Sequence, residues 1–135
     1  MRKILLAIVV IVLSSGQAHA WKRATHLIGV PFVAGTGVYS DVKVLQDADW
    51  AVTKAAAISN LGLMTVQASL GAFILSGKDS EATRTIHRIL GISIIASGVW
   101  LSVASSLDKG VEPPARYMAY AHTGLASVPL IIFSF

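Results

Sequence analysis

A histidine near the start of a long apolar run is the residue of this chain that is best placed for chemistry. His87 opens a segment with few polar residues, and Gly91 and Gly98 follow it on the same helical stripe. An imidazole in an apolar span is costly unless it is buried, hydrogen-bonded or bound to a metal. The glycines leave room beside it for a flat, bulky group, which fits a b-type haem held by imidazole. The alternative is a histidine hydrogen-bonded to a backbone carbonyl, beside glycines that allow close helix packing.

The composition favours a membrane protein of one domain. Of the 135 residues, 54% are apolar and 13% are charged, which is too apolar for a soluble domain of this length. Cysteine is absent, which excludes disulfides, thiolate metal sites, Cys-ligated iron–sulfur clusters and covalent haem attachment. The net charge is +4, but the charges lie in short clusters between apolar runs. This pattern indicates loops and helix ends at a membrane surface and argues against nucleic-acid binding.

Residues 1–20 have the pattern of a secretory signal peptide. Arg2 and Lys3 form the basic start, Ile4 to Leu13 the apolar core, and Ala18-His19-Ala20 a small-x-small cleavage site. We therefore expect residues 21–135 to be the mature domain, without His19, in a bacterial inner (cytoplasmic) membrane with a periplasmic N-terminus. An uncleaved anchor helix is the alternative.

The mature chain is predicted to be all-α, an integral membrane four-helix bundle. The expected spans are four apolar runs: His26–Tyr39, Trp50–Ser76, Thr85–Leu107 and Ala115–Phe135. The expected connections are a polar loop or short surface helix over Asp41–Asp49, a turn over Gly77–Thr83, and a loop over Asp108–Pro114. Short connections make neighbours antiparallel. An exported N-terminus puts the Gly77–Thr83 turn outside and the Asp108–Pro114 loop inside.

The histidines are expected at two depths. His26 and His87 would lie near the outer ends of parallel helices, each within one turn of the start of its span. Two imidazoles facing each other at one level can ligate one haem iron. His122 lies about 12 Å past Pro114 on the last span and so cannot share that haem. We expect it to be a core histidine hydrogen-bonded across the bundle.

A second metal site at His122 stays open at this point. Asn60 and Met64 are the groups expected at its depth, and a Met–His haem is chemically feasible. At the outer side, Arg84 and Arg88 would pair with haem propionates or, alternatively, extend to lipid headgroups.

Acidic side chains are expected only in the loops. No Ser/His/Asp set, phosphate loop or carboxylate pair is visible in the spans, so neither a hydrolase nor an ion pump is indicated. No internal repeat suggests a transporter. The chain is therefore expected to be an electron-transfer protein and not a stand-alone enzyme.

Three segments resemble the core of the cytochrome b561 family, transmembrane electron carriers with two b haems in four helices. Gln67–Gly77 is similar to the glycine-rich end of the second core helix, and Thr85–Ile92 to the His-Arg-x-x-Gly-Ile motif. Arg116–His122 is similar to the tyrosine-containing approach to the last histidine, and His26 would match the first. The resemblance implies ligand pairs between the first and third helices and between the second and fourth.

The second core helix here lacks a histidine, which leaves one haem, held by His26 and His87. One haem near one side does not carry electrons across the whole membrane, so the chain would need a quinone or a partner cytochrome. Beside the lipid bilayer, these are the expected partners. The rival hypothesis is a haem-free small membrane subunit with a structural or assembly role in a larger complex.

Overall fold

The computed structural model describes residues 18–133, with side chains from residue 29 to residue 128. It divides into one compact unit that ends at Phe32 and another that begins at Val33. The described residues form four helices and no strand: α2 (Ala18–Asp47), α3 (Ala51–Leu75), α4 (Glu81–Leu107) and α5 (Pro113–Phe133). The all-helical prediction is confirmed. Residues 1–17 of the predicted signal peptide lie outside the described residues.

Local capping explains where the later helices begin. The α3 bounds agree with the predicted span to within one residue at each end. Helix α4 begins four residues before the predicted span because Ser80 caps it: the Ser80 hydroxyl accepts from the Thr83 N–H, and the Thr83 hydroxyl accepts from the Ser80 N–H. Pro113 and Pro114, which were expected to close the loop after Asp108, instead form the first turn of α5. Proline is tolerated there because an N–H in the first turn has no partner within the helix.

The prediction of a polar loop or short surface helix over Asp41–Asp49 is wrong, because the long helix α2 continues to Asp47 and buries part of this segment. Asp41, Val44 and Ala48 fall on one helical stripe and are buried, with exposed fractions of 0%, 0% and 4%. Lys43 and Asp47, one turn apart, form an ion pair at 3.1 Å. Acidic residues are therefore not confined to loops: Asp41 is fully buried inside a helix.

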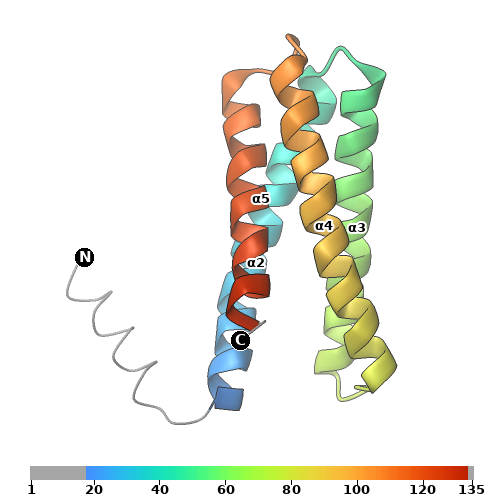
Figure 1. Cartoon of the computed structure of the whole chain (residues 1–135), viewed down its shortest axis with the longest axis vertical. Coiled ribbons are helices and arrows are strands. Elements are labelled where there is room, and N and C mark those ends of the chain that lie inside the picture. The colour runs from blue at the N-terminus through green and yellow to red at the C-terminus, as the bar shows by residue number, and fades with distance from the viewer. Residues whose placement is uncertain (1–17, 134–135) are drawn as a thin grey trace, which may run out of the picture. The chain divides into compact units, whose positions relative to one another are not determined.

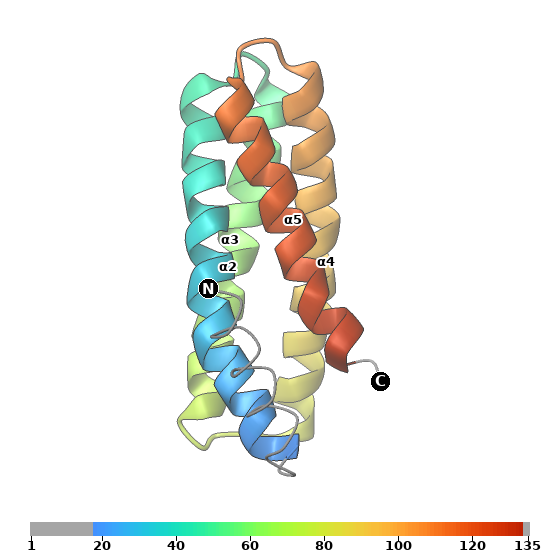
Figure 2. The ribbon, with the colours of Figure 1, turned by 90° about the vertical axis from the view of Figure 1, so that its left-hand side faces the viewer.

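From Val33 onward, the helices lie side by side as a four-helix bundle (Figures 1 and 2). In this unit α2 and α4 run in one direction and α3 and α5 in the other. The interior consists largely of small or polar side chains, among them Ala56, Ala57, Ser97, Ala104, Ser105, Ala115 and Ala119. Small side chains let helix backbones approach closely.

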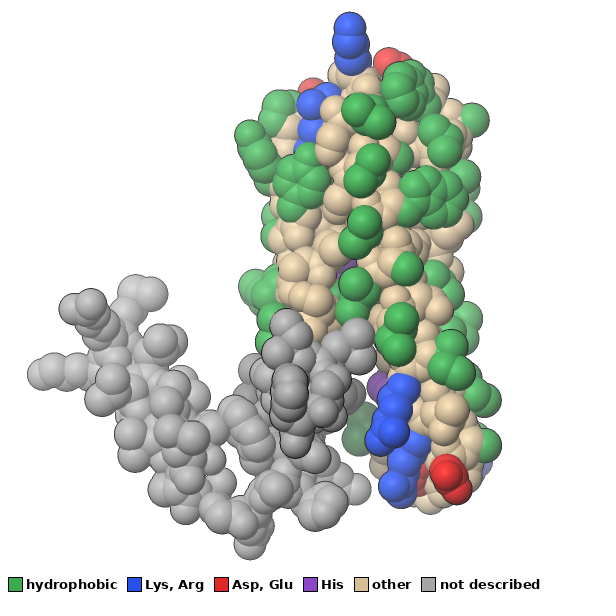
Figure 3. Space-filling view, viewed as in Figure 1, with side chains coloured by type: hydrophobic (Ala, Val, Ile, Leu, Met, Phe, Trp, Pro, Cys, Tyr) green, Lys and Arg blue, Asp and Glu red, His purple; other side chains and the backbone are tan. Residues whose placement is uncertain are grey.

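Large apolar side chains cover the outside. Residues with at least two-fifths of their surface exposed include Val52, Ile58, Val66, Phe73, Ile86, Ile89, Ile92, Val99, Trp100, Val103 and Leu107. Figure 3 shows such side chains spread along one face, with charged side chains toward the ends. Helices α3 and α4 are long and apolar enough to cross a membrane.

Asp108, at the C-cap of α4, joins the two connections at one end of the bundle. Its carboxylate accepts the backbone N–H of Trp50 at 2.9 Å, of Gly110 at 3.1 Å and of Asp49 at 3.3 Å. Burial alone would raise the pKa of this carboxyl, but these N–H donors and the Thr53 side chain together outweigh it and hold the pKa below its ordinary value of 3.8. The α2–α3 connection is thus bonded to the end of α4.

Two neighbours complete this junction. The Arg116 guanidinium donates to the Asp108 carbonyl at 2.9 Å. Gly110 packs so closely that a Cβ there would lie 2.7 Å from the Asp47 carbonyl oxygen and from the Asp49 carboxylate. The junction therefore depends on a carboxylate at position 108 and on a missing side chain at position 110.

We predict that Asp108→Ala lowers the free energy of unfolding by about 1–3 kcal/mol at neutral pH, because it leaves enclosed N–H groups without an acceptor. The folded-state pKa is lowered, so the Asp108 contribution is present above the ordinary carboxyl value and is lost as pH falls through the folded-state pKa. Thermal unfolding in detergent, at neutral pH and near pH 3, measures both effects. Glu112→Ala, at an exposed position in the same connection, is the control and should change little.

Candidate functional site

His122 on α5 lies in the middle of the bundle and is 1% exposed. Its Nδ1 is 3.0 Å from the carbonyl oxygen of Val33 on α2. A carbonyl only accepts, so Nδ1 carries the proton and donates it. The prediction of a core histidine hydrogen-bonded across the bundle is confirmed. Its other ring nitrogen, Nε2, is buried with no hydrogen-bond partner among the described residues.

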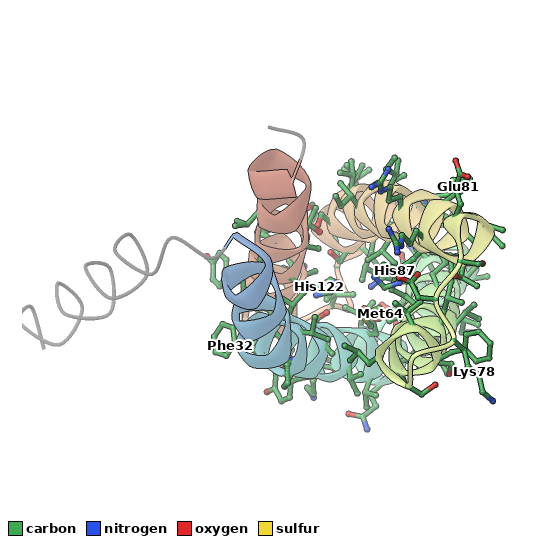
Figure 4. All side chains as sticks on the ribbon, turned by 90° about the horizontal axis from the view of Figure 1, so that it is seen from below. Phe32, Met64, Lys78, Glu81, His87 and His122 are labelled. Atoms are coloured by element: carbon green, nitrogen blue, oxygen red, sulfur yellow. The ribbon has the colours of Figure 1, made fainter. Side chains whose placement is uncertain are left out.

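Gly37 on α2 provides the room for this ring. A Cβ at position 37 would lie 2.5 Å from His122 Cε1, 2.6 Å from His122 Nδ1 and 2.6 Å from Met64 Sδ. The two side chains therefore meet at one point of α2, and the prediction that Met64 shares the depth of His122 is confirmed. In Figure 4 both point between the helices.

His87 on α4 faces α3. Its Nε2 lies 3.3 Å from the Gln67 side-chain nitrogen, and its Cε1 would be 3.5 Å from a Cβ at Gly71. The ring is half-buried and points inward, whereas Glu81 and Lys78 point away (Figure 4). If the amide nitrogen donates, the lone pair of His87 Nε2 accepts its hydrogen.

The two glycines of the His87 stripe have different neighbours. A Cβ at Gly91 would lie 3.7 Å from the Gln67 amide nitrogen, in the same layer as His87. Gly98 is buried against α5, where a Cβ would lie 2.7 Å from the Thr123 hydroxyl oxygen. Gly91 therefore borders the His87 layer, and Gly98 serves the contact between α4 and α5.

The arginines near the start of α4 lie at the surface. Arg84 Nε donates to both oxygens of Asp79, at 2.8 and 2.9 Å, and this contact lowers the pKa of the Asp79 carboxyl. Arg88 lines a surface hollow together with Glu81, Arg84 and Thr85. These side chains offer positive charge at the end of the bundle where His87 lies.

His26 falls within the α2 helix, but its side chain lies outside the described residues. Within the described part of the chain, no three His, Cys, Asp or Glu side chains come together as a metal site.

A buried polar group that the sequence did not predict lies between α2 and α3. The Asn60 amide nitrogen donates to the Asp41 carboxyl oxygens at 2.9 and 3.2 Å, and Ser40 lies beside them. All three residues are 0% exposed. The signal available in the sequence was that Asp41 lies one turn after Gly37, on a helical stripe that continues to Val44 and Ala48.

Comparison of the chain with models of protein families, with curated proteins and with solved structures gives no match. The resemblance to cytochrome b561 therefore depends on the three segments described above, and the function is argued from the site itself.

We predict that Gly37→Ala lowers the free energy of unfolding by about 1–3 kcal/mol, because the new methyl group overlaps the His122 ring and the ring is fixed by the Val33 carbonyl. Met64 can move aside more easily because its side chain is flexible. Thermal unfolding measures the change.

Gly35→Ala is the matched control on the same helix, since a Cβ there meets nothing within 4 Å. It should be neutral or slightly stabilising. Adding His122→Ala to Gly37→Ala should recover part of the loss. Equal destabilisation by the two alanine substitutions would contradict the packing assigned to Gly37.

Proposed function

We propose that this chain is an integral membrane protein whose four helices span the bilayer. The observation that supports this is the distribution of side chains: small and polar inside, large and apolar outside. A soluble bundle buries its large apolar side chains, whereas helices in lipid pack through small residues. The most apolar stretches of α3 and α4 are mostly exposed, which in water would be unfavourable.

We further propose that it is a b-type cytochrome, or a subunit of one, in which His26 and His87 would hold one haem. The inward-facing ring of His87 carries this proposal. The pairing with His26 rests on the sequence, in which both histidines lie near the start of spans expected to run parallel.

The residues around His87 would allow it to hold a haem on one condition. Its Nε2 faces the Gln67 amide, so iron binding at that atom requires the flexible Gln67 side chain to rotate away. Gly71 and Gly91 then leave the ring and its neighbourhood free of Cβ atoms. Arg84 and Arg88 can supply donors for propionates if Arg84 exchanges Asp79 for one of them.

A b haem held there would supply a one-electron carrier. The chain's own residues would hold it, keep lipid and water from its ligands, and set its charge environment. With one such group near one end, electrons would pass to a quinone or a partner cytochrome at the outer side of the inner membrane. The second site at His122 is a weaker candidate, because its ring fills the space at Gly37.

A specific observation favours a second function, that of a haem-free subunit in a larger membrane complex. The space that glycines leave on α4 is filled by the protein's own side chains, Gln67 over Gly91 and Thr123 over Gly98. Such filling is what close helix packing alone requires.

We predict that the turn between α3 and α4 lies outside the cytoplasm and the connection between α4 and α5 lies inside, given an exported N-terminus. Protease added to sealed, right-side-out vesicles should reach Lys78 and not Lys109. Cleavage at Lys109 with protection of Lys78 would reverse the topology. Protection of both positions in opened vesicles would show only that the sites resist the protease, so opened vesicles are the required control.

We predict that the protein purified in detergent shows the spectrum of a low-spin b haem, and that His87→Ala abolishes it. His26→Ala should have nearly the same effect, because one imidazole leaves a five-coordinate or empty site. The measurement is a reduced-minus-oxidised absorption spectrum with a haem stain.

His122→Ala is the matched control, since that histidine lies in a different layer, and it should leave the spectrum largely unchanged. Gln67→Ala should retain the haem, because it removes the amide that faces His87 Nε2. Loss of haem on His122→Ala, with retention on His26→Ala, would refute the ligand pair. Wild-type protein without haem after expression with ample haem supply would favour the structural subunit.

A further inference from the structure

Asp41 is a carboxyl group enclosed in the bundle, with neutral partners. It is 0% exposed and contacts the Asn60 amide and the Ser40 hydroxyl. An ionised carboxylate without a counter-charge is strongly unfavourable in apolar surroundings. Either a cation neutralises it or the carboxyl group carries a proton.

The charged groups of the surrounding helices do not reach it among the described contacts. On its own helix, Lys43 pairs with Asp47. On α5, His122 donates to Val33 and packs on Gly37, and Arg116 donates to Asp108 at the end of the bundle. The α4 sequence from residue 89 to residue 107 contains no charged residue. The charged residue of α3, Lys54, is exposed, and the α3 group that contacts Asp41 is the neutral Asn60.

The hydrogen atoms available at this site favour a proton on Asp41. The Ser40 hydroxyl lies 3.0 Å from the Gly37 carbonyl oxygen and 3.2 Å from Asp41 Oδ1. It has one hydrogen, so it can make a full hydrogen bond to only one of these two oxygens. If Asp41 Oδ1 is protonated, it donates to the Ser40 oxygen while Ser40 donates to Gly37. Asp41 Oδ2 then accepts from the Asn60 nitrogen at 2.9 Å.

We propose that Asp41, Ser40 and Asn60 form a proton-binding site inside the bundle, in which Asp41 holds a proton at neutral pH. Every polar contact of the carboxyl group is then used and no net charge is buried. The site is independent of the haem proposal, since it lies between α2 and α3 and its hydrogen bonds join Asp41 to Ser40 and Asn60.

Infrared spectroscopy of the purified protein in lipid vesicles at pH 7 tests this directly. A protonated carboxyl group has a carbonyl band separate from that of a carboxylate, and we expect one such band in the wild type. Asp41→Asn should remove it completely. The amide has nearly the same shape as the protonated acid and can donate to Ser40, so this variant should keep the helix content and thermal stability of the wild type.

Asp47→Asn, which removes a carboxylate paired with Lys43, is the control and should leave the band intact. Ser40→Ala should shift the band, because the acid proton loses its acceptor. A wild type without the band at pH 7, or a band that survives Asp41→Asn, would overturn the proposal. Loss of the band in sodium chloride but not in choline chloride at the same pH would assign the site to sodium and also overturn it.

Discussion

The carboxylate of Asp108 fixes the ends of the helices relative to one another. By accepting N–H groups from the α2–α3 connection and from its own loop, it joins the end of α4 to the start of α3. The depth of a residue along one helix can therefore be compared with that of a residue on another helix, measured from this end of the bundle. The layer of Gly37, Met64 and His122 follows from this register, and His87 belongs to a layer farther from that end.

Much of the fold could be predicted from the sequence, because long apolar runs separated by short polar turns specify helices with little ambiguity. Helix α3 was located almost to the residue. The failure at the end of α2 has a physical cause. Polarity alone suggested a loop over Asp41–Asp49, yet the polar and apolar residues there occupy different sides of a helix, with Asp41 turned inward and paired to Asn60.

The site was harder to predict than the fold, because helical spacing identifies a face of a helix but not its neighbour. Gly37 on α2 receives the ring of His122 on α5, and no spacing in the sequence indicates that pairing. Gly98 was assigned to the stripe of His87 and in fact receives Thr123. Which helix lies opposite a glycine depends on the register that Asp108 sets. Because Asp108 is distant in the sequence, the residues next to a glycine do not show which helix it will contact. The core role of His122 was predictable from depth alone.

The bundle encloses two carboxyl groups, Asp108 and Asp41, and the energetic cost of burying a charge is avoided in a different way at each. Asp108 follows the last turn of a helix, where loop N–H groups have no helical acceptor, and three of them converge on its oxygens. Asp41 lies inside α2, where the neighbouring N–H groups are used by the helix, and it receives only an amide and a shared hydroxyl. Backbone donors stabilise the charge of Asp108. Because Asp41 lacks them, the proton proposed for it is the remaining way to avoid a buried charge. The position of each carboxyl group along its helix thus decides its ionisation.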